Sequence, residues 1–435
     1  MNFLINPSRI YDSKLTVPGD KSVSHRALML GGIAKGCTRI KGFLAGQDCL
    51  STKSSMEALG VKIDMPTETE MLIQGVGLHG LSDPKIDLDL GNSGTGMRLI
   101  AGLLVGQDFS SRLIGDASLS GRPMGRIIKP LSKMGAKISS DINETPPLQI
   151  LGKSKLRAIH YDLPIASAQV KSAILLAGLY AEGITTLTEP AITRDHTERM
   201  LISMGARLSI SGKKLSIEGR YELSGCDIAV PSDLSSASFI ILAVLISKKA
   251  DVLIQNVGIN PTRIGVIEIL RSMGADITLE NKQQKSGEPV ADIRVKSSKL
   301  VGSVIDPSLV SLAIDEFPVL FVAAAYSQGK TTFSGIGELR VKESDRIAAM
   351  SEGLKKLGIT VDEYPDGAVI YGGKFSGGEV HSKGDHRIAM SLAVAGTIAD
   401  EQVIIKDVDS VDTSFPGFCE CMTEIGADIE RIEAS

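Results

Sequence analysis

A six-fold internal repeat is the feature that most constrains how this chain can fold. In each copy a helical segment ends at a glycine and a strand-like alternation follows, as in Ala-Leu-Gly-Val around Gly60. Glycine supplies the left-handed residue that stops a helix before a turn. The signature occurs at Gly60, Gly135, Gly205, Gly274, Gly358 and Gly426, at intervals of 68 to 84 residues. This spacing predicts six copies of one folding unit.

Each copy also holds an earlier helical segment, which begins at a polar loop and continues into small apolar residues. The body at 173–180 reads Ala-Ile-Leu-Leu-Ala-Gly-Leu-Tyr, and a β-rich run follows at 184–188. We therefore expect each unit to contain a loop, a helix, a strand, a second loop, a second helix, the glycine and a further strand. The six first-helix loops lie at residues 19–27, 91–98, 164–172, 231–238, 314–319 and 384–390.

The copies pair into two halves, because Val-Pro-Gly-Asp at 17–20 is echoed by Val-Pro-Ser-Asp at 230–233. From the pattern alone, residues 1–20 could belong to either half. We expect one domain of three units from residues 1–20 and 231–435, and a second from residues 21–230. The first helices are rich in Ala, Gly and Ser, so they can pack closely in the middle of each domain. The predicted fold class is α/β or α+β. The chain has no Walker Gly-x4-Gly-Lys-Ser motif, which argues against a nucleotide-binding fold of that type.

The overall charge and the cysteines narrow the class of protein. A net charge of −4 and a pI of about 6.0 create no global field for nucleic acid or a membrane surface, so any anion site must be local. The five cysteines form no Cys-x-x-Cys pair, and the histidines add no ligand spacing, so we expect neither a metal nor a cofactor. We expect a cytoplasmic protein, because the cysteines fit reduced thiols, the N-terminus does not resemble a signal peptide, and no apolar run is long enough to span a membrane.

Cations gather in the Ser- and Gly-rich loops. Lys21 and Arg26 flank the start of the first helix, while Arg122 and Arg194 lie in second-helix loops. The run at 338–346 adds Lys342 and Arg346. Taken singly, Ser22, Thr95 and Ser167 could simply cap helices, and the 338–346 run could be a solvated helix start. Taken together, these loops predict a site for small anions such as phosphate and carboxylate, because helix N-termini and Arg both bind them. The nearby acids Asp315 and Glu343 suit proton transfer.

Several stretches together resemble the 5-enolpyruvylshikimate-3-phosphate (EPSP) synthase family, and they occur over nearly the full length in the family's order. The resemblance implies transfer of enolpyruvyl from phosphoenolpyruvate to the 5-hydroxyl of shikimate 3-phosphate in the shikimate pathway, without a cofactor. It also implies two domains of three βαβαββ units that close on the substrates, in a cytoplasmic and monomeric enzyme. The matching stretches are Pro-Gly-Asp-Lys-Ser-x-Ser-His-Arg (18–26), Gly-Asn-Ser-Gly-Thr-Gly-Met-Arg (91–98), Gly-Asp-x-Ser-Leu-x-x-Arg-Pro-Met (115–124), Arg-Val-Lys-Glu-Ser-Asp-Arg (340–346) and Asp-His-Arg-Ile-Ala-Met (385–390).

The resemblance also implies roles for individual residues. Asp315 corresponds to the acid that takes the 5-hydroxyl proton, and Glu343 to the acid that protonates the methylene carbon, with Lys21 as a third catalytic group. Shikimate 3-phosphate would be held by Lys21, Ser22, Arg26, Ser167, Ala168, Gln169, Arg194, Asp315 and Lys342. Phosphoenolpyruvate would be held by Lys21, Gly94, Thr95, Arg122, Gln169, Arg346 and Arg387.

Two departures from the family pattern affect these expectations. Some members carry a lysine just before the Thr-Phe-Pro near the C-terminus, whereas residues 412–416 here read Asp-Thr-Ser-Phe-Pro. One cationic contact to phosphoenolpyruvate is then absent or supplied elsewhere. Residues 167–169 and 315–318 resemble a subclass that is often insensitive to glyphosate, but that subclass often has Ala where this chain has Gly94. We expect Gly94 to leave room for glyphosate.

Two other functions remain as alternatives. UDP-N-acetylglucosamine enolpyruvyl transferase shares the fold and the donor, but it typically has a reactive cysteine in the loop that corresponds to residues 115–125, where this chain has none. A non-catalytic anion-binding relative would keep the repeat. The presence of both Asp315 and Glu343 argues against that second alternative.

Overall fold

The chain forms two compact units, and the computed structural model describes residues 1–153 and 155–433. The first, here called the terminal unit, contains residues 1–18, 231–284 and 289–435. The second, here called the inserted unit, contains residues 19–230 together with the short segment 285–288.

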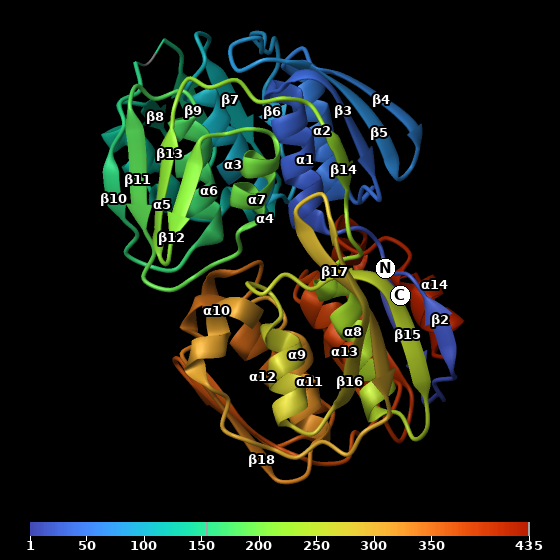
Figure 1. Ribbon diagram of the computed structural model, residues 1–435. Coiled ribbons are helices and arrows are strands. Elements are labelled where there is room, and N and C mark those ends of the chain that lie inside the picture. The colour runs from blue at the N-terminus through green and yellow to red at the C-terminus, as the bar shows by residue number, and fades with distance from the viewer. Residues whose placement is uncertain (154, 434–435) are drawn as a thin grey trace. The chain divides into compact units, whose positions relative to one another are not determined.

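The elements of the inserted unit follow the predicted order of helices and strands (Figure 1). Its helices are α1 (Lys21–Ile33), α2 (Gln47–Ala58), α3 (Gly94–Leu104), α4 (Ala117–Ser120), α5 (Gly125–Lys133), α6 (Ala168–Gly178) and α7 (His196–Ser203). Its strands are β3 (Lys35–Lys41), β4 (Lys62–Thr67), β5 (Glu70–Val76), β6 (Leu88–Asp89), β7 (Ser111–Ile114), β8 (Lys137–Ser139), β9 (Leu148–Leu151), β10 (His160–Asp162), β11 (Ile184–Thr188), β12 (Leu208–Ser211), β13 (Lys214–Glu218) and β14 (Asp227–Ala229).

The terminal unit repeats the same scheme. Its helices are α8 (Leu234–Ile246), α9 (Gly265–Ser272), α10 (Val310–Ala313), α11 (Phe317–Tyr326), α12 (Arg346–Lys356), α13 (His386–Gly396) and α14 (Phe418–Glu424), with 3-10 turns at Pro307–Leu309, Gly337–Val341 and Asp409–Thr413. Its strands are β1 (Asn2–Asn6), β2 (Ser13–Leu15), β15 (Asp251–Gly258), β16 (Asp276–Lys285), β17 (Glu288–Lys296), β18 (Lys330–Ser334), β19 (Val361–Tyr364), β20 (Gly367–Tyr371), β21 (Gly378–His381), β22 (Val403–Lys406) and β23 (Asp428–Ile432).

The sheets show the repeat directly. Each four-stranded sheet begins with a parallel pair and continues with an antiparallel pair. The sheet β18-β20-β19 has three strands, and isolated parallel bridges from Val301 and Val304 stand where a fourth strand would pair. The four-stranded orders are β14-β3-β5-β4, β6-β7-β9-β8 and β10-β11-β13-β12 in the inserted unit, and β2-β15-β17-β16 and β21-β22-β1-β23 in the terminal unit.

The first helix of each repeat lies in the core of its unit, as the small apolar residues predict. All 13 residues of α8 are buried, which is expected of a helix that is apolar on every side. In the inserted unit α3 packs against α6 (Figure 1). A Cβ at Gly102 would lie only 2.5 Å from the carbonyl oxygen of Ala173, so glycine is required for the two backbones to approach this closely.

The repeated glycines end the second helix of each repeat. All six have positive φ, between 84° and 102°, and each stands two residues beyond the last helical residue. After Gly60, for example, the amide of Val61 donates to the carbonyl of Met56, 3.1 Å away, which closes the helix end. The left-handed conformation predicted from the repeat is therefore present in every copy.

Candidate active site

The first predicted anion-binding helix, α1, begins as its sequence indicates. The carboxylate of Asp20 caps it by accepting from the amide of Val23 at 2.8 Å. Lys21, in the first turn, pairs with Asp48 of α2, and the ammonium nitrogen lies 3.0 Å from the carboxylate oxygen. The side chain of Lys21 keeps 19% of its surface exposed, whereas that of Asp48 keeps 9%. Lys21 is thus held by a mostly buried acid and is itself accessible.

Arg26 is buried and held from three sides. Its guanidinium donates to the Thr197 hydroxyl at 2.6 Å, to the Ser172 hydroxyl at 2.9 Å and to the Ser22 carbonyl at 2.9 Å. Burial lowers the pKa of Arg26 to about 10, and the nearby positive charge of Arg194 adds to this, although the carboxylate of Glu198 opposes it. Two cations within electrostatic reach of each other favour the binding of an anion.

His25, next to Arg26, is fully buried and links three helices. Its Nδ1 lies 2.8 Å from the Thr52 hydroxyl in α2, and its Nε2 lies 3.3 Å from the hydroxyl of Ser93, which caps α3. Burial, reinforced by the charges of Lys21 and Arg26, lowers the pKa of His25 to about 3. His25 is therefore neutral at pH 7 and fixes α1 against the start of α3.

The start of α3 forms a second part of the site, with Gly94 and Thr95 in its first turn. The Gln169 side chain joins two of its groups: its amide nitrogen donates to Thr95 at 2.9 Å, and its oxygen accepts from Arg98 at 2.8 Å. Arg122 donates to the Asn92 side-chain oxygen at 2.6 Å and to the Ser118 hydroxyl at 3.1 Å. These contacts hold two guanidinium groups near the N-terminus of one helix.

The loop that carries Arg194 is anchored by a buried ionic cluster. Lys171 of α6 pairs with Glu198 at 2.7 Å and with Glu189 at 3.0 Å, and all three side chains are at most 4% exposed. The Lys171 ammonium also donates to the carbonyl of Thr193 at 3.2 Å. The residue before Arg194 is therefore tied to the helix that begins just after the Ser167 cap.

In the terminal unit, Arg346 connects the two predicted catalytic acids. Its guanidinium lies 2.6 Å from a Glu343 oxygen and 3.5 Å from an Asp315 oxygen, and its Nε lies 2.8 Å from Asp385. Burial alone would lower the pKa of Arg346, but the carboxylates of Asp385, Glu343 and Asp315 outweigh it and raise that pKa above its ordinary value. Lys342 lies 3.4 Å from the same Asp315 oxygen.

Arg387 completes this second group from the first turn of α13. It donates to the backbone carbonyl of Asp315 at 2.8 Å and lies 3.4 Å from the buried Glu316 carboxylate. Asp385, the residue before α13, caps this helix by accepting from the amide of Arg387 at 2.9 Å. The run at 338–346 does lead into a helix start, because Asp345 caps α12 by accepting from the amide of Ala348 at 3.0 Å, but Arg346 is only 2% exposed, so this start is not a solvated one.

The predicted site residues thus fall into two groups, one in each unit. The inserted unit carries Lys21, Ser22, Arg26, Gly94, Thr95, Arg122, Ser167, Ala168, Gln169 and Arg194, and the terminal unit carries Asp315, Lys342, Glu343, Arg346 and Arg387. Sequence reasoning missed Asp48 and Arg98. Arg98 stands in the same motif as Gly94, and its spacing of one helical turn would have placed it there, whereas no local signal marks Asp48.

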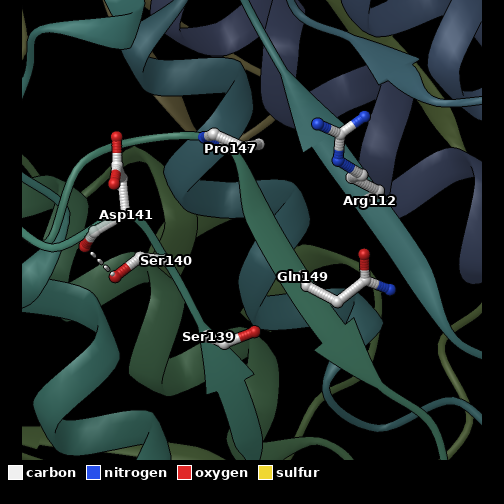
Figure 2. Close-up of a pocket in the computed structure, with 6 residues that line it drawn as sticks. All are labelled: Arg112, Ser139, Ser140, Asp141, Pro147 and Gln149. Carbon is white, nitrogen blue, oxygen red and sulfur yellow. Dashed lines mark hydrogen bonds between the residues drawn. The ribbon is translucent and has the colours of Figure 1, made fainter.

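A pocket of about 390 Å³ lies elsewhere in the inserted unit, on the sheet β6-β7-β9-β8 (Figure 2). None of the predicted site residues lines it. Its lining residues are Arg112, Ser139, Ser140, Asp141, Pro147 and Gln149, and Arg112 is paired with Asp87 at 2.5 Å. We assign no function to this pocket because its lining cation is already neutralised and the site motifs lie elsewhere.

Comparison with known proteins decides the family. The family model of EPSP synthase (3-phosphoshikimate 1-carboxyvinyltransferase) matches residues 5–422. This chain belongs to the EPSP synthase family. The 3-phosphoshikimate 1-carboxyvinyltransferase of Alkalilimnicola ehrlichii is 54% identical over 435 residues, covering 100% of this chain and 98% of the relative. That of Methylococcus capsulatus is 53% identical and covers 98% of each chain.

Solved structures agree with these relatives and with the predicted fold class. An EPSP synthase from Acinetobacter baumannii superposes with a TM-score of 0.89 at 50% identity, covering 99% of this chain and 100% of that one. The mixed α/β architecture of two similar three-repeat halves, with helices inside, is thereby confirmed.

The EPSP synthase family membership establishes the activity. The chain is a transferase of the shikimate pathway, which leads to the aromatic amino acids. It transfers the enolpyruvyl group of phosphoenolpyruvate to the 5-hydroxyl of shikimate 3-phosphate and releases phosphate. This finding favours EPSP synthase activity over the UDP-sugar alternative and over a non-catalytic relative. Among the residues that the structure describes, no helix has the length and apolarity needed to cross a bilayer.

Proposed function

We propose that the two groups of site residues divide the EPSP synthase reaction between binding and proton transfer. Shikimate 3-phosphate is bound by residues of both units. In the inserted unit these are Lys21, Ser22, Arg26, Ser167, Ala168, Gln169 and Arg194, and in the terminal unit they are Asp315 and Lys342. Phosphoenolpyruvate is bound by Lys21, Gly94, Thr95, Arg122, Gln169, Arg346 and Arg387. The clusters of Lys and Arg at helix starts support this assignment, because both substrates are small polyanions.

Proton transfer falls to Asp315 and Glu343 in this proposal. Glu343 donates a proton to the methylene carbon of phosphoenolpyruvate, which builds positive charge on the neighbouring carbon. The 5-hydroxyl attacks that carbon while its proton passes to Asp315. The tetrahedral adduct then loses phosphate as a methyl proton returns to Glu343, which restores the carbon–carbon double bond, and the proton on Asp315 leaves with the phosphate. Lys21, Lys342 and the arginines stabilise the charge on the carboxylate and on the departing phosphate.

A single observation carries this division of roles. Both acids contact the buried guanidinium of Arg346, at 2.6 Å for Glu343 and 3.5 Å for Asp315. Their side chains remain 25% and 17% exposed, so each can meet a substrate while Arg346 holds the pair in place.

The test replaces each carboxylic acid by the amide of the same size and shape. We expect Asp315→Asn and Glu343→Gln to lower kcat by a factor on the order of 100 to 10,000, the usual contribution of one general acid or base. Phosphate release from phosphoenolpyruvate is measured with shikimate 3-phosphate, and with UDP-N-acetylglucosamine in parallel. Asp362→Asn, at an exposed position of β19, is the control. Full turnover in either active-site variant would overturn the roles assigned here.

We also propose that the two compact units are the two domains of the enzyme and that it acts as a monomer in the cytoplasm. The thiols support a reducing compartment: all five cysteines are free, and burial raises the pKa of Cys419 to about 11 and that of Cys421 to about 12. Such thiols are protonated and unreactive at neutral pH. Analytical ultracentrifugation tests the monomer, and a mass near twice 46.1 kDa would contradict it.

A further inference from the structure

The turn of the β16–β17 hairpin has contacts that its sequence position does not suggest. The strands β16 and β17 belong to the terminal unit, but residues 285–288 at the turn group with the inserted unit. The Ser286 hydroxyl accepts from the amide of Ala229 at 2.9 Å. Arg199 of α7 donates to the carbonyl of Gly287 at 3.1 Å. The turn is therefore fixed both to the strand β14 and to the helix α7.

The strongest of these contacts joins Glu288 to His196. The carboxylate oxygen lies 2.7 Å from Nδ1 of the ring, although the two residues are 92 positions apart. Glu288 is 5% exposed and His196 is 3% exposed. Nε2 of the same ring is buried and has no hydrogen-bond partner among the described residues. Since an ionised carboxylate only accepts hydrogen bonds, the Nδ1–H of His196 donates this hydrogen bond to Glu288.

His196 occupies a position from which it can set the geometry of the shikimate 3-phosphate site. It is the first residue of α7, two residues after Arg194. The next residue, Thr197, accepts from Arg26 at 2.6 Å. Fixing the ring of His196 therefore fixes the backbone from Arg194 to Thr197. Arg194 and Arg26, which contacts Thr197, are the two arginines assigned above to shikimate 3-phosphate.

The charge of Glu288 reaches the same site. Its carboxylate acts on the buried Arg26 guanidinium and favours the charged form, whereas Arg194 disfavours it. Glu288 thus stands within electrostatic reach of the cation that it helps to position.

We propose that Glu288 is a positioning residue for shikimate 3-phosphate. By accepting from Nδ1 of His196, it holds the first turn of α7 so that Arg194 and Thr197 keep their places. This inference rests on the roles proposed above for Arg26 and Arg194. Glu288 touches the histidine, so it acts through that residue and takes no part in the proton transfers.

The experiment measures KM for each substrate and kcat, on the full-length enzyme, for two variants at each end of the contact. Glu288→Ala and His196→Ala should each raise KM for shikimate 3-phosphate about tenfold, because a displaced binding group costs up to about a hundredfold per ångström. KM for phosphoenolpyruvate and kcat should stay within about twofold. Glu288→Gln keeps an acceptor for Nδ1, so its KM should stay within about threefold.

His196→Asn gives the sharpest test. The asparagine amide places a donor where Nδ1 stands and has no atom at the place of Nε2, for which the described part of the chain provides no hydrogen-bond partner. It should therefore restore KM for shikimate 3-phosphate to within about threefold, and the double variant E288A/H196A should be no worse than either single variant. Glu280→Gln, at a partly exposed position on the same hairpin where a carboxylate oxygen lies 3.9 Å from Arg294, is the matched control and should change nothing.

The outcomes separate this inference from the proposed function. If Arg194→Ala leaves KM for shikimate 3-phosphate unchanged, the site assignment itself fails. If Arg194→Ala raises that KM but Glu288→Ala and His196→Ala do not, only the positioning role fails. A parallel fall in kcat, both affinities and the melting temperature in the alanine variants, without rescue by asparagine, would show a general structural role and also overturn the proposal.

Discussion

At the scale of single residues, Gly94 shows how closely packed the residues are that we propose bind phosphoenolpyruvate. A Cβ at this position would lie 2.8 Å from a guanidinium nitrogen of Arg98 and 3.2 Å from one of Arg122. Both atoms are the ends of flexible side chains, so Gly94→Ala should fold. The two guanidinium groups, of which we propose that Arg122 binds phosphoenolpyruvate, would have to move from their present positions.

We expect Gly94→Ala to raise KM for phosphoenolpyruvate about tenfold, because displaced charged donors bind an anion less well. The wild-type enzyme should be inhibited by glyphosate, and the variant should resist it. Initial rates over a titration of each compound measure both effects. The control is Gly121→Ala, where the nearest atom to the new Cβ would lie 3.7 Å away. Wild-type activity that survives millimolar glyphosate would contradict the expectation for Gly94.

His25 gives a prediction about pH. Its folded-state pKa is about 3, against about 6.5 for an unperturbed histidine. Between these values the unfolded chain binds a proton that the folded chain does not. The contribution of His25 to stability is therefore complete above about pH 6.5 and is lost as the pH falls, by up to about 1.4 kcal/mol per pH unit.

Replacing this histidine by a group that does not titrate should remove that pH dependence. Between pH 7 and pH 5, we expect the free energy of unfolding of the wild type to fall by about 2 kcal/mol more than that of His25→Asn. Urea unfolding followed by circular dichroism, at both pH values, measures the difference. Parallel pH dependences in the two proteins would mean that His25 is not held neutral in the fold.

At the scale of elements, the repeated glycines separate two costs of a Gly→Ala substitution. One is the strain of a left-handed backbone conformation, and the other is the clash of the new Cβ with its neighbours. Gly205 and Gly426 have similar φ values, 92° and 102°, at equivalent helix ends. A Cβ at Gly205 would meet nothing within 4 Å, whereas one at Gly426 would lie 2.4 Å from the ring of Tyr11 and 2.5 Å from the carbonyl oxygen of Arg9.

Gly205→Ala should therefore lower the free energy of unfolding only by the strain of a left-handed alanine, about 1 to 2 kcal/mol. Gly426→Ala carries the same cost and in addition must displace the backbone at Arg9, so it should destabilise the protein clearly more. Thermal unfolding of the two variants compares them directly. Equal losses would show that the contact with Arg9 relaxes freely.

The same elements show what the sequence could and could not predict. All six first helices begin inside their predicted loops, because each start is marked by a local change from polar to small apolar residues. The partners that complete the sheets have no such local signal. β14 pairs with β3, nearly 190 residues earlier, through Asp227 and Arg39. The contact of Glu288 with His196 likewise has no sequence motif, since it depends on a hairpin turn that meets a distant helix.

At the scale of the whole molecule, the chain order makes the two units unequal. The inserted unit holds every strand of its three sheets within residues 19–230, including β14 at 227–229. The terminal unit depends on the first residues of the chain. β1 lies between β22 and β23, and Asn2 faces Lys406 on one side and Ile432 on the other. Phe3 and Ile5 of this strand are fully buried in the core.

This asymmetry predicts how fragments of the chain behave. A fragment of residues 19–230 should fold by itself, because it lacks only the short turn 285–288. Residues 231–435 alone should not fold, because β22 and β23 lose the strand that joins them.

Moving residues 1–18 to the end of the second fragment, through a short Gly-Ser linker, should restore its fold, since Asn2 and Ile432 are already paired neighbours. Circular dichroism and cooperative urea unfolding of the three fragments test this, and the permuted fragment controls for chain length. If residues 231–435 unfolded as cooperatively without residues 1–18 as with them, β1 would be dispensable and the sheet order would not explain why the terminal unit needs both ends of the chain.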